Sequence, residues 1–200
     1  MTKKDATKAA ARRAAREQRR EAERRAATRA QRRTTLIWGG GALAVILVVA
    51  LLVVSRIRGP SGPGERIPEV PGAGTHLVQG QPYRGRYNSN PPTSGPQWPA
   101  PAAWGVYTEP LADETVLHNL EHGGVWVSYR DPKDSDLAGK LEGLGRRYRK
   151  VIVTPRPAND APIALAAWGR LLKLQAFDEA QIVAFIEAYM GKTGPEPNAP

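Results

Sequence analysis

Two histidines with helical spacing carry the strongest chemical signal in the sequence. His118 and His122 lie four residues apart in the segment HNLEHGG, so on a helical turn both imidazole rings face the same side, about 6 Å apart. Imidazole nitrogens at this separation can bind one metal ion. The alternative is structural, with one ring donating a hydrogen bond to a backbone carbonyl and the other in solvent. The chain contains no cysteine, which excludes thiolate metal sites, disulfides and a cysteine nucleophile.

The same five residues match H-x-x-E-H, the inverted signature of zinc proteases. In that signature Glu121 would act as the general base for a zinc-bound water. Such a site needs a long rigid helix and a large scaffold that holds the peptide, whereas Gly123 and Gly124 follow His122 at once. We therefore expect a domain without enzymatic activity, with a metal-dependent hydrolase that uses Glu121 as the weaker alternative.

A proline-rich polar segment, residues 87–98, offers a second candidate site. Seven of the 13 aromatic residues of the chain fall within residues 83–129. Flat rings beside amides and hydroxyls can form a groove for a sugar or a peptide, although proline-rich loops also need aromatic side chains for their own packing. The residues that would form such a cell-wall or protein interaction surface are Asn88, Asn90, Thr93, Ser94, Gln97 and Trp98.

Short apolar runs separated by prolines and glycines predict the elements that must position these residues. Strands are expected at residues 125–129, 151–153 and 163–168, and helices at residues 137–148 and 178–190. Asp178 followed by Gln181 is typical of a capping box at the start of the last helix. Prolines exclude long helices between residues 76 and 110, which we expect to be a loop region. The order predicts an α/β domain of two layers, with α+β as the alternative.

Positive charge is concentrated at the N-terminus. Residues 1–34 contain 13 Lys and Arg against four acidic residues, whereas residues 59–200 contain 14 against 15, within a net charge of +10 for the whole chain. This tail has no large aliphatic side chain with which to form a core, and we expect it to bind anionic lipid headgroups. It also lacks the interleaved aromatic residues of a nucleic-acid-binding segment, so nucleic acid is not an expected partner.

An uncharged stretch of 22 residues, Thr34–Ser55, follows the tail. A helix of this length spans about 33 Å, which is enough for a hydrocarbon core of about 30 Å. The stretch is longer than the apolar region of a secretory signal peptide, and no A-x-A-like cleavage site follows it, so we expect an uncleaved signal-anchor. Because positive charge marks the cytoplasmic side, the N-terminus of this single-pass chain is expected in the cytoplasm and the C-terminal domain outside it.

Several segments of the chain resemble one bacterial family. They read YNSNPPTSGP, WGVYTEPL, HNLEHGGVWVSY, APIALAAWGRLLKL and FDEAQIVAFIEAYMGKTGPE. Together they are similar, from about His76 to Glu196, to the family of domain of unknown function 3105, whose members also have one N-terminal membrane span and an exported domain. The family has no established activity, so the resemblance implies none for this chain. His76, His118 and His122 match family positions, but the histidine that usually follows Ser-Gly-Pro in the family is Gln97 here.

The expected organisation of the chain has five parts. They are a basic cytoplasmic tail (residues 1–34), a transmembrane helix (35–55), a Pro/Gly linker (56–75), the extracytoplasmic domain (76–191) and a disordered tail (192–200). The leading hypothesis is that the domain binds a transition metal, Zn(II) or Cu(II), through His118, His122 and His76, with Glu121 or water as a further ligand. The alternative is an interaction module for the cell wall or a protein, without a metal.

Overall fold

The computed structural model describes residues 40–41, 44–52, 54 and 60–200, and the chain divides into two compact units, Met1–Gly59 and Pro60–Pro200. In the first unit, residues 44–52 are helical. None of the helices within the described residues has both the length and the apolar character that crossing a membrane requires. The predicted transmembrane helix, residues 35–55, lies partly outside the described residues and the basic tail, residues 1–34, wholly outside them, so both remain predictions.

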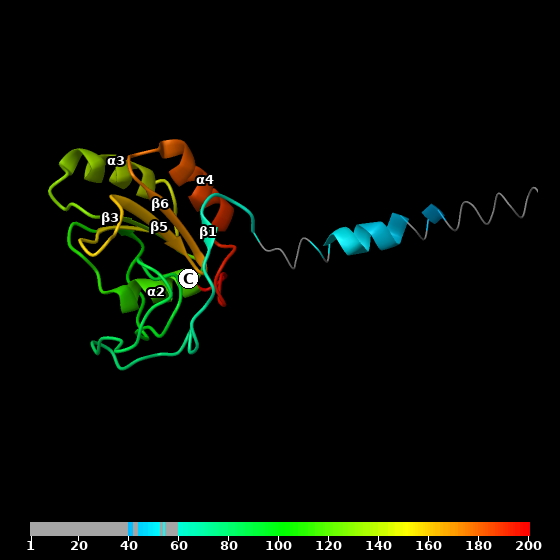
Figure 1. The fold of residues 1–200 in the computed structure, drawn as a ribbon, viewed down its shortest axis with the longest axis horizontal. Helices are drawn as coiled ribbons and strands as arrows, with labels where there is room; N and C mark the ends of the chain where they lie inside the picture. Colours follow the sequence, from blue (N-terminus) through cyan, green and yellow to red (C-terminus); the bar gives the residue numbers. More distant parts are fainter. Residues whose placement is uncertain (1–39, 42–43, 53, 55–59) are drawn as a thin grey trace, which may run out of the picture. The chain divides into compact units, whose positions relative to one another are not determined.

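A six-stranded mixed sheet forms the centre of the second unit (Figure 1). Its strands are β1 (Glu65–Arg66), β2 (Gly105–Val106), β3 (Val125–Tyr129), β4 (Val151–Pro155), β5 (Ile163–Ala167) and β6 (Arg170–Leu174). Their order across the sheet is β1-β6-β5-β3-β4-β2. β4 is parallel to β2 and β3, whereas the β3–β5, β5–β6 and β1–β6 pairs are antiparallel. The prediction of an α/β fold is confirmed at this level.

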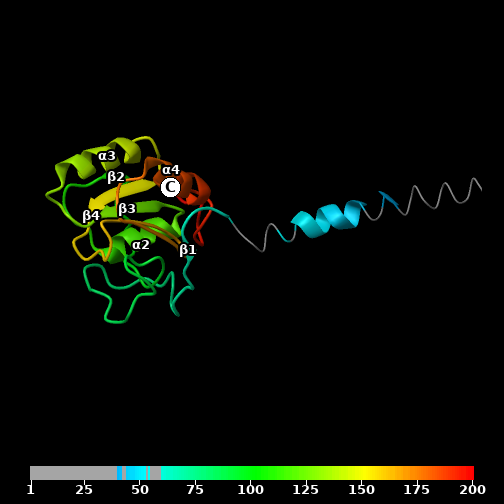
Figure 2. The same cartoon turned by 45° about the horizontal axis from the view of Figure 1, so that its top comes forward.

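Helices lie on both faces of the sheet (Figure 2). The first face is covered by α3 (Ser135–Gly145) and α4 (Glu179–Tyr189), and the second by α2 (Asp113–Glu121) together with the proline-rich loops. Every residue of β3, β4 and β5 is buried, as expected for strands that are covered on both sides. The prediction of two layers is therefore wrong, because the strands are apolar on both faces and each face needs its own cover.

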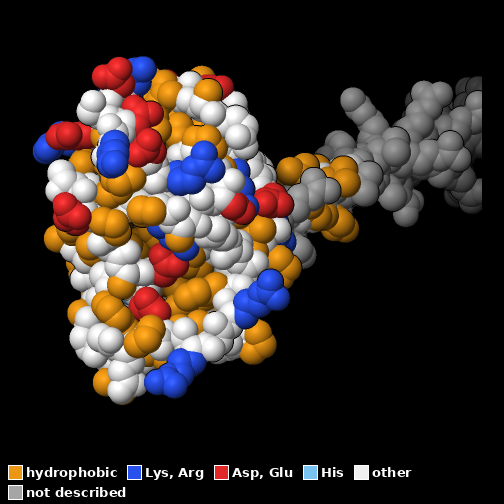
Figure 3. Space-filling model, turned by 60° about the vertical axis from the view of Figure 1, so that its left-hand side comes forward, with side chains coloured by type: hydrophobic (Ala, Val, Ile, Leu, Met, Phe, Trp, Pro, Cys, Tyr) orange, Lys and Arg blue, Asp and Glu red, His pale blue; other side chains and the backbone are white. Residues whose placement is uncertain are grey.

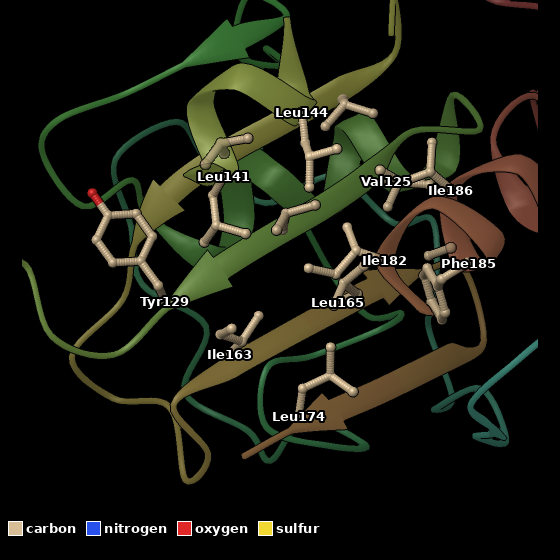
Figure 4. Close-up of a cluster of buried hydrophobic side chains, with 14 of the residues drawn as sticks. Val125, Tyr129, Leu141, Leu144, Ile163, Leu165, Leu174, Ile182, Phe185 and Ile186 are labelled. Atoms are coloured by element: carbon tan, nitrogen blue, oxygen red, sulfur yellow. The ribbon is translucent and has the colours of Figure 1, made fainter. Parts of the chain in front are cut away.

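Two separate apolar clusters fill the spaces on either side of the sheet. The larger cluster joins α3 and α4 to the first face and includes Leu165, Phe185 and Ile186, all fully buried (Figure 4). The smaller cluster joins α2 to the second face through Trp126 and Ile152. The second face thus depends on one nine-residue helix, and the loops that complete its cover carry part of the candidate site.

The five predicted elements are present, with ends that differ by a few residues. The strands β1, β2 and β6 and the full length of α2 are not among the predicted elements. Ala167 at the end of β5 pairs with Arg170 at the start of β6, and only Trp168 and Gly169 connect the two strands. Gly169 has a φ of +66°, which lets so short a connection turn the chain. α2 was expected only as a turn around His118, since its apolar residues are few and are interrupted by polar ones.

The segment that the sequence assigns to a linker packs onto the domain from Pro60 onward, and residues 56–59 lie outside the described residues. The hydroxyl of Tyr189 donates to the carbonyl of Pro63 (3.2 Å), and Arg170 Nη2 donates to the carbonyl of Pro60 (3.1 Å). β1 then pairs with β6 at the edge of the sheet. Packing of this kind was not visible in the sequence, because the segment has no hydrophobic periodicity.

Lys, Arg, Asp and Glu side chains are interspersed on the face of the domain that Figure 3 shows. This mixture agrees with the nearly equal numbers of basic and acidic residues after position 58. The strongly basic character of the chain belongs to the N-terminal tail.

A first prediction concerns the N-cap of α4. Asp178 accepts hydrogen bonds from the side-chain amide and the backbone N–H of Gln181 (2.7 and 3.0 Å), and these bonds lower the pKa of Asp178 below its ordinary value of 3.8. Stabilisation by the carboxylate is therefore complete above that value and is lost as the pH falls through the lowered pKa. Asp178→Ala should lower the midpoint of thermal unfolding at pH 7, and by less as the pH approaches 2.

The matched control is Asp178→Asn, which keeps a side-chain oxygen that can cap the helix but cannot titrate. It should stay close to the wild type in stability at low pH. An Asp178→Ala penalty that is the same at both pH values would contradict this assignment.

Candidate metal centre

The last turn of α2 carries the candidate site. The helix ends at Glu121, and His122 follows it with its backbone N–H donating to the carbonyl of His118 (3.1 Å). Gly123, with a φ of +78°, then turns the chain into β3, a conformation that favours glycine. Asn119 fixes the helix against the loop, because its side chain both donates to and accepts from the backbone of Ala102 (2.9 Å each).

His118 is buried, with 6% of its surface exposed. Its Nδ1 lies 2.7 Å from the carbonyl oxygen of Trp98, so this nitrogen carries the ring proton and donates it. Burial lowers the pKa of His118 below its usual range, against the opposing effect of this hydrogen bond. A neutral ring with the proton on Nδ1 leaves a lone pair on Nε2, which is the form in which histidine binds metals.

The proline-rich segment brings His76 beside His118. His76 and Gln97 form an isolated parallel bridge, in which Leu77 N donates to the Gln97 carbonyl (2.7 Å). One residue further on, Trp98 N donates to the carbonyl of Glu114 in α2 (3.1 Å). These backbone bonds connect the loop to the helix and stack the His76 ring on the His118 ring, with centroids 5.0 Å apart.

Glu121 and Gln97 meet inside the same cluster. Both side chains are buried, and Gln97 Nε2 donates to Glu121 Oε2. The Oε1 atom of Gln97 finds no hydrogen-bond partner among the described residues. The backbone of Gly74 lies close by, since a Cβ at that position would come within 2.9 Å of Glu121 Oε1. Three residues each offer one potential ligand atom within 4.8 Å of the others: His76, His118 and Glu121.

His122 contacts this group through His118. The two Nε2 atoms are 3.1 Å apart, and the rings are nearly perpendicular. His122 Nδ1 lies 3.3 Å from the backbone oxygen of Pro200, and its Nε2 lies 3.6 Å from Glu196 Oε2. The structure therefore brings His76, His118 and Glu121 together. His122 joins them only through its contact with His118, and Glu196, which no pattern in the sequence indicated, contacts His122.

Residues 194–200, here called the C-terminal strap, cover this end of α2, where the sequence predicts a disordered tail. Glu196 N donates to the carbonyl of Glu121 (3.1 Å). Lys150 Nζ donates to the carbonyls of His122 and Pro197 (3.0 Å each) and to that of Ala199. The expectation of disorder does not hold because backbone groups, rather than apolar side chains, attach the strap, and composition does not reveal such bonds.

The polar residues of the proline-rich loop are used inside the fold. Asn88 Nδ2 donates to the hydroxyls of Thr93 and Ser94 (2.8 and 3.0 Å), both of which are fully buried. Asn90 donates to the carbonyl of Ala158 (2.8 Å), and Trp98 Nε1 donates to a backbone carbonyl of the same loop region. These contacts favour a structural role for the loop over an open interaction surface.

The aromatic residues between positions 83 and 129 also pack internally. Trp126 is completely buried and donates to the Thr154 hydroxyl (2.8 Å). Tyr87 donates to the carbonyl of Pro96 (3.0 Å), and burial raises the pKa of its hydroxyl above the usual range. A cavity of about 550 Å³ does lie beside the strap, lined by Trp104, Arg149 and Met190 among others, but none of the predicted site residues lines it.

Comparison with known proteins gives one result. The sequence profile of the DUF3105 family, described as "Protein of unknown function", matches residues 80–200. The chain belongs to this family. No curated protein and no solved structure matches the chain. The DUF3105 match contains α2, Gln97 and the strap, but it begins at residue 80, so the expected resemblance at His76 lies outside it.

A second prediction tests how the strap is attached. Lys150→Met removes the ammonium group that donates to three backbone carbonyls, and hydrogen bonds from charged groups contribute about 1.5–3 kcal/mol each. Because Lys150 is only half-buried and the freed carbonyls can bind water instead, the free energy of unfolding should fall by about 2 kcal/mol, less than the sum for three such bonds. The amide hydrogen of Glu196 should also exchange faster. Lys133→Met, at an exposed position, is the control. Unchanged exchange at Glu196 in Lys150→Met would show that Lys150 does not hold the strap.

Proposed function

We propose that this DUF3105 domain binds one Zn(II) or Cu(II) ion through His76, His118, His122 and Glu121. The supporting observation is the arrangement of two imidazoles. The Nδ1 atoms of His118 and His122 both face backbone oxygens, at 2.7 and 3.3 Å, and are therefore placed to carry the ring protons. Two Nε2 lone pairs then face each other at 3.1 Å. A cation between them turns this repulsion into two bonds.

The spacing of the donor atoms supports the same conclusion. Ligand bonds of about 2.0 Å around a tetrahedral zinc ion put neighbouring donor atoms about 3.3 Å apart. The Nε2 atom of His118 lies 3.1 Å from His122 Nε2 and 3.9 Å from Glu121 Oε2. Both distances from His118 Nε2 are close to this value. Imidazole and carboxylate donors suit Zn(II) and Cu(II), and the carboxylate offsets one positive charge.

Gln97 supports the site from the loop. Its amide N–H holds the Glu121 carboxylate, which fixes the orientation of a ligand. Its unpartnered Oε1 is buried beside the same cluster, where a neighbouring cation would compensate for the missing hydrogen bond. The residue that stands at the usual histidine position of the family thus keeps a role at the site, as a positioning residue.

The proposal favours binding over hydrolysis. A general base must be free to take a proton from water. Glu121 Oε2 instead accepts a hydrogen bond from Gln97 and lies 3.9 Å from His118, so we assign this carboxylate to the metal ion. The interaction module without a metal has less support, because the side chains of Asn88 and Asn90 in the proline-rich loop hydrogen-bond within the domain.

We further propose that the domain is exported and held at the membrane by residues 35–55. The support is the uncharged stretch of 22 residues and the excess of basic residues that precedes it. In this position the domain would handle a metal ion outside the cytoplasm.

A third prediction tests the metal site with two glutamates of the same helix. Glu121 and Glu114 are 7% and 9% exposed, but Glu114 accepts a hydrogen bond from the backbone N–H of Tyr83 (2.8 Å) and is not part of the metal cluster. Titration calorimetry of the full chain in detergent should show one Zn(II) per chain. Glu121→Gln should weaken binding at least about tenfold, and Glu114→Gln should leave the affinity unchanged. Equal affinities for both variants and the wild type would contradict the assignment of Glu121.

A fourth prediction tests the topology. Because the chain has no cysteine, a single introduced cysteine is the only thiol that a maleimide can label. Single cysteines are introduced in the tail with Ala6→Cys and at an exposed position of the domain with Lys133→Cys. A membrane-impermeant maleimide added to intact cells should label Cys only in the Lys133→Cys variant, and both variants after lysis. Labelling of the Ala6→Cys variant in intact cells would contradict the proposed orientation.

A further inference from the structure

We infer that His122 and Glu196 form an outer position at which the metal ion is captured before it passes to the buried ligands His118 and Glu121. This inference rests on the proposed metal site and assigns the strap a part in loading it. Neither the sequence pattern nor the family match indicates a role for Glu196.

The exposure of the side chains decreases along this path. The side chain of Glu196 is 63% exposed, that of His122 is 12% exposed, and that of His118 is 7% exposed. A hydrated cation can therefore reach Glu196 directly, whereas the side chain of His118 is almost completely buried. The carboxylate of Glu196 also supplies the negative charge that attracts a cation to this end of α2.

The donor atoms are spaced for transfer by exchange of one ligand at a time. Glu196 Oε2 lies 3.6 Å from His122 Nε2, which in turn lies 3.1 Å from His118 Nε2. His122 therefore reaches both positions with the same atom, and an ion held by Glu196 and His122 can bind His118 while it is still attached to His122. The ion does not need to return to bulk water between the two positions.

The strap keeps Glu196 at this place. Its backbone N–H donates to the carbonyl of Glu121 at 3.1 Å, and Pro195 and Pro197 restrict the backbone on both sides of it. Gly194 lies so close to the helix end that a Cβ there would come within 2.3 Å of the Glu121 carbonyl oxygen. These contacts hold the backbone of residues 194–196 against the end of α2.

Glu196→Gln distinguishes capture from permanent ligation, because a group that only assists transfer changes association and dissociation by the same factor. Zn(II) association with the full chain, and its release to a fluorescent zinc chelator, are followed by stopped flow. Both rates should fall on the order of tenfold, with the same dissociation constant as the wild type. Glu187→Gln, an exposed carboxylate on α4, controls for the loss of one charge. Amide exchange of the strap verifies that Glu196→Gln remains docked.

Two results would overturn the inference. A weaker affinity with an unchanged association rate would make Glu196 a permanent ligand, and unchanged rates would make its contact with His122 a plain ion pair. Wild-type protein that binds no Zn(II) at all would instead overturn the proposed function on which the inference rests, so the two failures are distinguishable.

Discussion

Strands β3, β4 and β5 present apolar side chains on both faces of the sheet, and one of those faces has only a nine-residue helix to cover it. The apolar cluster on that face, which contains Trp126 and Ile152, is therefore covered by residues of α2 together with residues of the proline-rich segment such as Tyr87 and Ala102. Arg156 connects the parts, because it binds Asp113 at the start of α2 with two hydrogen bonds (2.7 and 2.8 Å) and also donates to Asn90 of the loop. The placement of the candidate site follows from this need for cover.

The loop that covers the second face runs along α2, and two hydrogen bonds of the Trp98 backbone fix its position there. The Trp98 N–H donates to the carbonyl of Glu114, and the Trp98 carbonyl accepts from His118 Nδ1. The same residue therefore attaches the loop to the helix and directs the free nitrogen of His118 toward Glu121 and His122. Packing and site chemistry share these contacts, so a change that loosens the loop should also disturb the metal ligands.

The sequence predicts the apolar elements well and the contacts through backbone groups poorly. Runs such as VWVSY and VIV predict β3 and the first part of β4, and the pair Asp178 and Gln181 predicts the cap of α4, because these signals are local. The spacing of His118 and His122 likewise predicts two converging rings. The docking of the linker and of the strap escaped prediction, since it rests on carbonyl groups that every residue has. For the same reason Glu196 could not be placed beside His122 from its position in the sequence.

The most direct test of the account is the protonation of the histidine rings, observed in long-range proton–nitrogen NMR spectra of the full chain before and after one equivalent of Zn(II). We expect His118 to carry its proton on Nδ1 in both states, because the Trp98 carbonyl accepts it, and we expect the Nε2 resonance to move when zinc is added. Binding of zinc without any change at the Nε2 of His118, or a proton on that atom in the zinc-loaded protein, would contradict the central claim that His118 is the shared ligand of this site.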